Sequence, residues 1–199
     1  MTTTESPAMV RLRDAVGRTV AAGTARATLL MDMSGTRAVG EALPRRLRPL
    51  PALARAVLRR VPRQVVTSGV LDLPRRRAMV GHDHIAFVQI EDRVWSGRPG
   101  RRLDRLGLTD PGRIVTPLAA FDRLADVTEA HDHGVVADRG ERWRRLTVTT
   151  GDGEPGEVWL DGAHVRRIRL PEQRQDSTTV TLDAFGTDVD DRDWTRLPG

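Results

Sequence analysis

Short runs of β-prone residues, separated by turn-forming residues, dominate positions 66–98. Val, Ile, Phe, Thr and Trp fill the runs, and Leu-Pro, Gly-His-Asp and Glu-Asp-Arg separate them. This pattern is typical of an antiparallel meander. It predicts strands near residues 65–71, 75–81, 84–91 and 93–98.

A second series of β-prone runs occupies the C-terminal part of the chain. It predicts strands near residues 128–137, 141–150, 157–160, 165–170 and 178–185. The turns between them are rich in Asp and Gly, and Asp-Gly is a strong hairpin signal. The sequence GDGEPG at 151–156 has the glycine spacing of a dinucleotide-binding fingerprint but not its structural context. It lies between antiparallel strands and begins no helix, so we interpret it as a turn.

The N-terminal segment changes from a helical to a strand period. Residues 8–22 predict an amphipathic helix that ends before Gly23 as a C′ glycine. Its apolar stripe comprises Val10, Leu12, Ala15, Val16 and Thr19 or Val20. Residues 24–33 then alternate, which predicts a strand with one apolar face. That face comprises Ala25, Ala27, Leu29 and Met31.

Residues 34–64 form a Pro- and Arg-rich insert between predicted strands. Pro51 favours the start of a short basic amphipathic helix. One interpretation is a fixed cap whose apolar side packs on the sheet. The other is a mobile lid or membrane-surface helix over a ligand cavity.

The remaining elements complete an α+β architecture. Residues 100–113 are a predicted loop, and Thr116 as N-cap with Pro117 at N1 begins a helix over 118–125. About ten antiparallel strands with two or three helices predict a curled antiparallel sheet. We expect this sheet to be an unclosed β-barrel with helices plugging or capping its hollow. No linker interrupts the β series, so we expect a single domain over 1–199.

The composition excludes several classes of protein. With 39% hydrophobic and 30% charged residues, and no long apolar run, the chain is neither disordered nor membrane-spanning. All 32 basic residues are Arg, a bias typical of a high-GC genome such as that of an actinobacterium. Acidic residues interleave with them, so we expect no nucleic-acid partner. The N-terminus has no apolar signal region and Cys is absent, so we expect a cytoplasmic protein without disulfides or thiolate metal sites.

Two identical His-Asp-His triplets are the candidate chemical groups. The first comprises His82, Asp83 and His84, and the second comprises His131, Asp132 and His133. Within a strand, residues two apart share a face, so each triplet can aim two imidazoles in one direction. Adjacent triplets would build an acid–base cluster or a four-histidine metal site. The alternative is solvated histidines at strand ends. We expect no metal and no cofactor.

Apolar residues of the predicted elements are candidates for the wall of a ligand cavity. The strands contribute Leu29, Met31, Ile85, Phe87, Val94, Trp95 and Val135, and the second helix contributes Leu118 and Phe121. Ordinary core packing accounts for the same residues.

Several short segments resemble the lipoprotein-carrier superfamily, the LolA-like and LppX/LprG-type proteins. They are AGTAR at 22–26, SGVLD at 68–72, RRA at 76–78, Val94-Trp95, the helix after Pro117, VWLD at 158–161 with its preceding Glu157, and 166–170. The resemblance implies an unclosed β-barrel whose apolar concave face holds lipid acyl chains and is plugged by helices. We expect this chain to depart from that pattern, because it shows no apolar signal region and no Cys to lipidate, and it carries the 34–64 insert.

The resemblance implies a protein that binds a hydrophobic small molecule, lipid or polyketide-like, for sequestration or delivery. An alternative is a cofactor-free cyclase or isomerase of natural-product biosynthesis that uses the two triplets as acid–base groups. A third is an interaction module whose basic insert contacts an acidic partner or a membrane surface.

Overall fold

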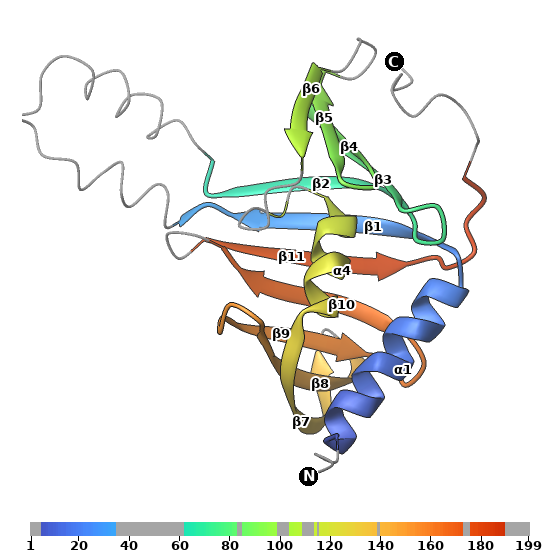
Figure 1. The fold of residues 1–199 in the computed structure, drawn as a ribbon, viewed down its shortest axis with the longest axis vertical. Coiled ribbons are helices and arrows are strands. Elements are labelled where there is room, and N and C mark those ends of the chain that lie inside the picture. Colours follow the sequence, from blue (N-terminus) through green and yellow to red (C-terminus); the bar gives the residue numbers. More distant parts are fainter. Residues whose placement is uncertain are drawn as a thin grey trace, which may run out of the picture.

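The computed structural model describes residues 5–34, 62–82, 85–98, 104–108, 114, 116–138, 140–172 and 176–189. These ranges form one antiparallel sheet and two helices, α1 (Pro7–Ala21) and α4 (Pro117–Ala125) (Figure 1). Apart from its two ends, the 34–64 insert lies outside the described residues. The two interpretations of the insert, a fixed cap or a mobile lid, fall on those residues.

Eleven strands make up the sheet. They are β1 (Thr24–Asp32), β2 (Gln64–Asp72), β3 (Arg77–His82), β4 (Ile85–Ile90), β5 (Arg93–Gly97), β6 (Asp104–Leu108), β7 (Val127–Asp138), β8 (Glu141–Thr150), β9 (Pro155–Leu160), β10 (Val165–Pro171) and β11 (Ser177–Asp183).

The strand order places β1 at the centre. It runs β6-β5-β4-β3-β2-β1-β11-β10-β9-β8-β7, so one meander extends from each side of β1. The edge strands β6 and β7 do not pair with each other, and the sheet therefore stays open. The predicted α+β fold, a curled and unclosed antiparallel sheet with helices, is confirmed.

One predicted loop contains a strand. Residues 104–108, expected within the 100–113 loop, form β6 and pair with β5, where Leu108 lies opposite Arg93. The segment DRLGL has no run of β-branched or aromatic residues. Backbone pairing with the edge of β5 makes this strand, and a side-chain pattern does not report such pairing.

Both helices lie over the same face of the sheet, the helix-covered face (Figure 1). Helix α4 contacts β1 and β3, and α1 contacts β7 and β10. The predicted inward residues of β1 face them, and Ala25, Ala27 and Leu29 are at most 1% exposed. Together with the helices they form the main core, so the predicted alternation of β1 is correct.

The buried side of α1 differs from the predicted stripe. Val10 and Val20 are 45% and 39% exposed. The buried positions are Ala8, Met9, Leu12, Ala15 and Thr19. The last of these, Thr19, is polar, and it can be buried because its hydroxyl makes two hydrogen bonds inside the core. The helix ends as predicted, with Gly23 following the C-cap at a φ of 87°.

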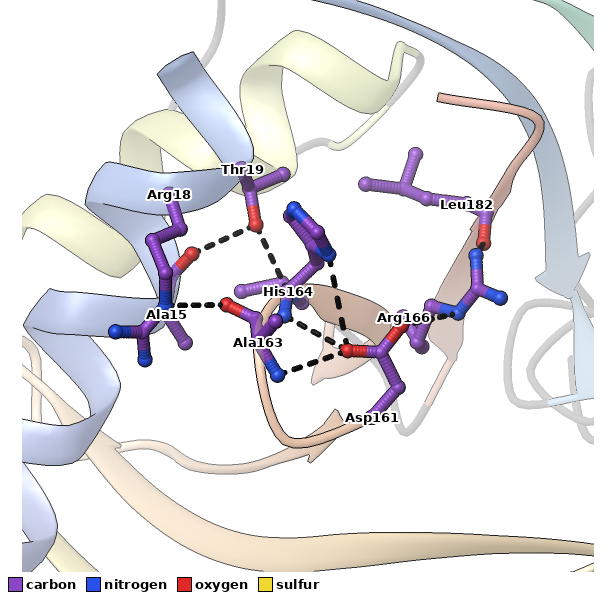
Figure 2. Close-up of polar contacts among 9 residues, drawn as sticks. Ala15, Arg18, Thr19, Asp161, Ala163, His164, Arg166 and Leu182 are labelled. Atoms are coloured by element: carbon purple, nitrogen blue, oxygen red, sulfur yellow. Dashed lines mark hydrogen bonds and ion pairs between the residues drawn. The ribbon is translucent and has the colours of Figure 1, made fainter. Parts of the chain in front are cut away.

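Thr19 joins α1 to the start of β10 (Figure 2). Its hydroxyl donates a hydrogen bond to the carbonyl of Ala15 at 2.7 Å and accepts one from the backbone N–H of Val165 at 2.8 Å. Beside it, the Arg18 side chain donates to the carbonyl of Ala163 at 2.9 Å. These contacts fix the C-terminal end of α1 on the sheet.

We expect Thr19→Val to lower the free energy of unfolding by about 1–3 kcal/mol, because it leaves the buried N–H of Val165 without an acceptor. Urea denaturation measures this loss. Thr128→Val is the matched control, since the Thr128 hydroxyl is exposed and bonds weakly to the carbonyl of Thr149 at 3.3 Å. Equal losses in the two variants would contradict the role given to Thr19.

Candidate ligand-binding site

The candidate site lies where β1 ends and β2 begins, on the helix-covered face. Met31 lies opposite Val65, and Leu29 lies opposite Thr67. Residues directly opposite on antiparallel strands project from the same face. The side chains of Val65 and Thr67 therefore share the face of Leu29.

The register carries this face onto the next two strands. Gly69 lies opposite Val80, and Val80 lies opposite Phe87. His82 and Ile85 form the next pair on the same face. We define the β1–β4 surface as Met31, Val65, Thr67, His82, Ile85 and Phe87.

Burial changes sharply across the β1–β4 surface. Leu29 and Val80, which border it, are fully buried, whereas Met31, Val65 and Phe87 are partly buried. Ile85 is 37% exposed. Apolar side chains thus remain accessible directly beside the packed core, and a ligand that covered them would gain about 25 cal/mol for each Å² removed from water.

Thr67 and His82 are the polar members of this surface, and of the two Thr67 is the buried one. It is 1% exposed, and its hydroxyl has no hydrogen-bond partner among the described residues. A buried hydroxyl without a partner costs about 1–3 kcal/mol. This side chain therefore marks a polar point inside an apolar region.

Two buried polar residues fix the start of α4 over β4. The Thr116 hydroxyl caps the helix by accepting from the N–H of Ala119 at 3.3 Å, and it donates to the side-chain carbonyl of Gln89. The Gln89 amide donates in turn to the carbonyl of Glu91 at 2.8 Å. Thr116 and Gln89 are fully buried. These bonds fix the position of α4 beside the β1–β4 surface.

The predicted wall residues separate into three groups. Leu29, Leu118 and Phe121 belong to the main core. Met31, Ile85, Phe87 and Val94 lie on the same face by register, and Val94 is buried. Val135 is distant from them, on the edge strand β7, and is 50% exposed.

Trp95 lies on the opposite face of the sheet. It pairs with Val88, which is on the reverse side from Phe87. There it packs in a second apolar cluster with Val70, Met79, Val88, Ile90 and Val189. Its neighbour Val94 faces the helices because successive residues of a strand point to opposite faces.

The described part of the first histidine triplet lies far along the sheet from the second triplet. His82 is on β3 and the second triplet is on β7, seven strand steps away, or roughly 34 Å along the sheet at about 4.8 Å per step. His131 lies opposite Thr147, and His133 bonds to the Thr147 hydroxyl at 2.7 Å, both on the face without helices. The adjacency that a shared acid–base cluster or four-histidine site would need is not present between β3 and β7. Asp83 and His84 lie outside the described residues.

Asp132 has a structural position between α1 and the sheet. Its carboxylate accepts hydrogen bonds from Arg11 of α1, from Arg144 at 2.6 Å and from the N–H of Gly134 at 2.8 Å. Desolvation acts to raise the pKa of Asp132, but the Gly134 and Arg144 hydrogen bonds and the Arg11 charge outweigh it and lower that pKa. A carboxylate held in this way is a poor proton acceptor near neutral pH.

Other polar sites of the described chain do not resemble an apolar pocket. A pocket of about 680 Å³ beside α1 is lined by Arg11, Arg18, Arg144, Glu5 and Asp14, among others. A second, of about 570 Å³, contains Asp32, Arg145, Glu157 and Arg169.

Within the described ranges, no three His, Asp or Glu side chains are grouped as metal ligands. No described helix is long and apolar enough to cross a membrane.

Sequence reasoning missed Thr67 and Gln89. The sequence did carry one signal for them. Each lies two positions along the strand from an inward apolar residue, Val65 or Phe87, and therefore faces the same side. A polar residue at an inward position calls for a partner. Gln89 has one in Thr116.

The sequence matches no family model and no curated protein. Among solved structures, the chain is similar to lipoprotein LppX from Mycobacterium tuberculosis, with a TM-score of 0.53 and 12% identity over 94% of this chain and 99% of that chain. The chain has the LppX-type fold. LprF from Mycobacterium bovis gives 0.49 and 15% identity, over 94% and 97% of the two chains. A LolA superfamily protein from Nitrosomonas europaea gives 0.41 and 9%, over the same shares.

We expect Asp132→Asn to lower the free energy of unfolding at neutral pH and to differ less from the parent chain as the pH falls. The folded-state pKa of Asp132 lies below its ordinary value of 3.8, so the stability that the carboxylate adds is present above that value. It disappears as the pH drops through the folded-state pKa.

Urea denaturation between pH 7 and pH 3 checks this expectation. Asp183→Asn is the control, because its exposed carboxylate lies 4.0 Å from Arg26 and contributes little. A loss for Asp132→Asn that stays constant down to pH 3 would contradict the assignment.

Proposed function

We propose that this protein binds a hydrophobic small molecule, of the lipid or polyketide class, at the β1–β4 surface, for sequestration or delivery. The observation that carries the proposal is the partial exposure of Met31, Ile85 and Phe87 beside a fully buried core on one face of the sheet. An amphipathic ligand that covered these side chains would extend that core.

The rigidity of the surroundings supports this function. The Thr116–Gln89 contact holds α4 at one side of the surface, and β1 is paired on both of its edges. A preformed apolar surface loses little conformational entropy on binding. Each ligand methylene that becomes buried contributes about 0.8 kcal/mol, so micromolar affinity, about 8 kcal/mol, requires roughly ten or more buried methylenes.

The fold is consistent with this proposal. LppX, which shares the fold, is a lipoprotein. The resemblance to lipoprotein carriers implies acyl chains held against an apolar sheet face with helices over it. In this chain that face is the one that α1 and α4 cover (Figure 1).

The enzymatic alternative has no observation in its favour. It requires acid–base groups from both triplets around one ligand. His131 and His133 lie on the reverse face of a distant strand, and Asp132 is held by Arg11 and Arg144. Of the described triplet residues, this leaves His82 at the β1–β4 surface.

We expect Ile85→Glu to weaken binding of the fluorescent apolar probe N-phenyl-1-naphthylamine by tenfold or more, because it places a charge where the probe would cover apolar surface. Fluorescence titration measures the dissociation constant. Val66→Glu is the matched control, since Val66 is 47% exposed and pairs with Leu30 on the opposite face.

The control should bind the probe like the parent chain. Equal affinity of the parent chain and Ile85→Glu would place any binding elsewhere. The proposed function would be contradicted if the parent chain bound no apolar probe and carried no apolar molecule in native mass spectrometry after purification.

A further inference from the structure

The Thr67 hydroxyl has a property that the proposed function alone does not explain. It is buried on the helix-covered face, directly opposite Leu29, and pairs with no described group. Valine has nearly the same shape without the polar atom, and β2 uses it at positions 65, 66 and 70. Valine at position 67 would fill the same space with no unsatisfied group.

We infer that the ligand carries a neutral hydrogen-bonding group, an ester, ketone or hydroxyl, that pairs with the Thr67 hydroxyl. This inference rests on the proposed function and names the chemical class of its ligand. An acyl chain covering Met31 and Ile85 would pass over Thr67, because these residues lie on one face of β1, β2 and β4. Its polar group would reach the buried hydroxyl by displacing the side chains that cover it.

The charge distribution on the described part of this face favours a neutral group. The described residues on the helix-covered face of β1, β2, β3 and β4 include no Arg, Asp or Glu. The charged residues of these strands, such as Arg26, Asp32 and Arg77, fall at positions of the opposite parity. Among these residues, His82 is therefore the titratable group on this face.

Among the described residues of this face, a carboxylate beside Thr67 would lose its hydration without gaining an Arg partner. Burying an ionised carboxylate costs far more than one hydrogen bond returns. A carbonyl or hydroxyl loses less hydration and recovers it by bonding to Thr67. A plain alkane would cover the surface and leave the Thr67 hydroxyl unsatisfied. The site therefore distinguishes these three ligand classes.

The test compares Thr67→Val and Thr67→Ser in the full chain. Methyl dodecanoate, dodecane and dodecanoate each displace N-phenyl-1-naphthylamine, and the titrations give their affinities. We expect Thr67→Val to weaken methyl dodecanoate about tenfold, the equivalent of one hydrogen bond, and to leave dodecane unchanged. Thr67→Ser should stay within about twofold of the parent for both. The parent should bind the ester more tightly than the carboxylate.

The unliganded variants supply an independent readout. We expect the melting temperature of Thr67→Val to equal or exceed that of the parent chain, because the substitution removes an unsatisfied hydroxyl. A lower melting temperature would show that the hydroxyl already has a partner in the protein, and would overturn the inference.

The remaining outcomes separate the two proposals. If ester and alkane bind the parent but Thr67→Val changes both equally or neither, the inference fails and the proposed function stands. Tighter binding of dodecanoate than of its ester likewise overturns the neutral class. If none of the three binds the parent chain, both proposals fail.

Discussion

Pairing of β1 on both of its edges is the constraint on which this structure depends. One edge holds β2 and the other holds β11, so the first strand of the chain joins two meanders that are far apart in sequence. Its inward residues Ala25, Ala27 and Leu29 are buried under the helices. A one-residue slip of β1 would turn this apolar set to the opposite face and separate both halves from the core.

The same constraint places the candidate site. Since Leu29 is fixed inward, its partner Thr67 is inward as well, and the register carries the face on to Phe87 and Ile85. Charged positions of these strands then fall on the reverse side. The apolar character of the β1–β4 surface thus follows from the register of β1, and α4 is added beside it through Thr116 and Gln89. The sheet also places His82 on β3 and the second histidine triplet on its far edge strand, β7.

Period-two patterning explains which parts of this structure were predictable. Alternation reports the face of a residue, and it correctly placed Ala25, Ala27 and Leu29 on one buried face of β1. It does not report which strands are neighbours, so the separation of β3 from β7 could not be foreseen. Trp95 was grouped with Val94 by composition, although adjacent residues of a strand face opposite ways. Strand β6 depends on backbone pairing alone. The inward position of Thr67 could be read from the alternation of its strand. The absence of a hydrogen-bond partner for its hydroxyl is known only once the neighbouring strands are placed.

Contact between a ligand chain and the β1–β4 surface is the central claim of this account. Methyl NMR measures it directly, through nuclear Overhauser effects between bound methyl dodecanoate and labelled Ile and Met methyl groups. The account predicts such effects from the ligand chain to the methyl groups of Ile85 and Met31, with none to Met79, which lies on the reverse face. Effects to Met79 without any to Ile85 or Met31 would contradict it.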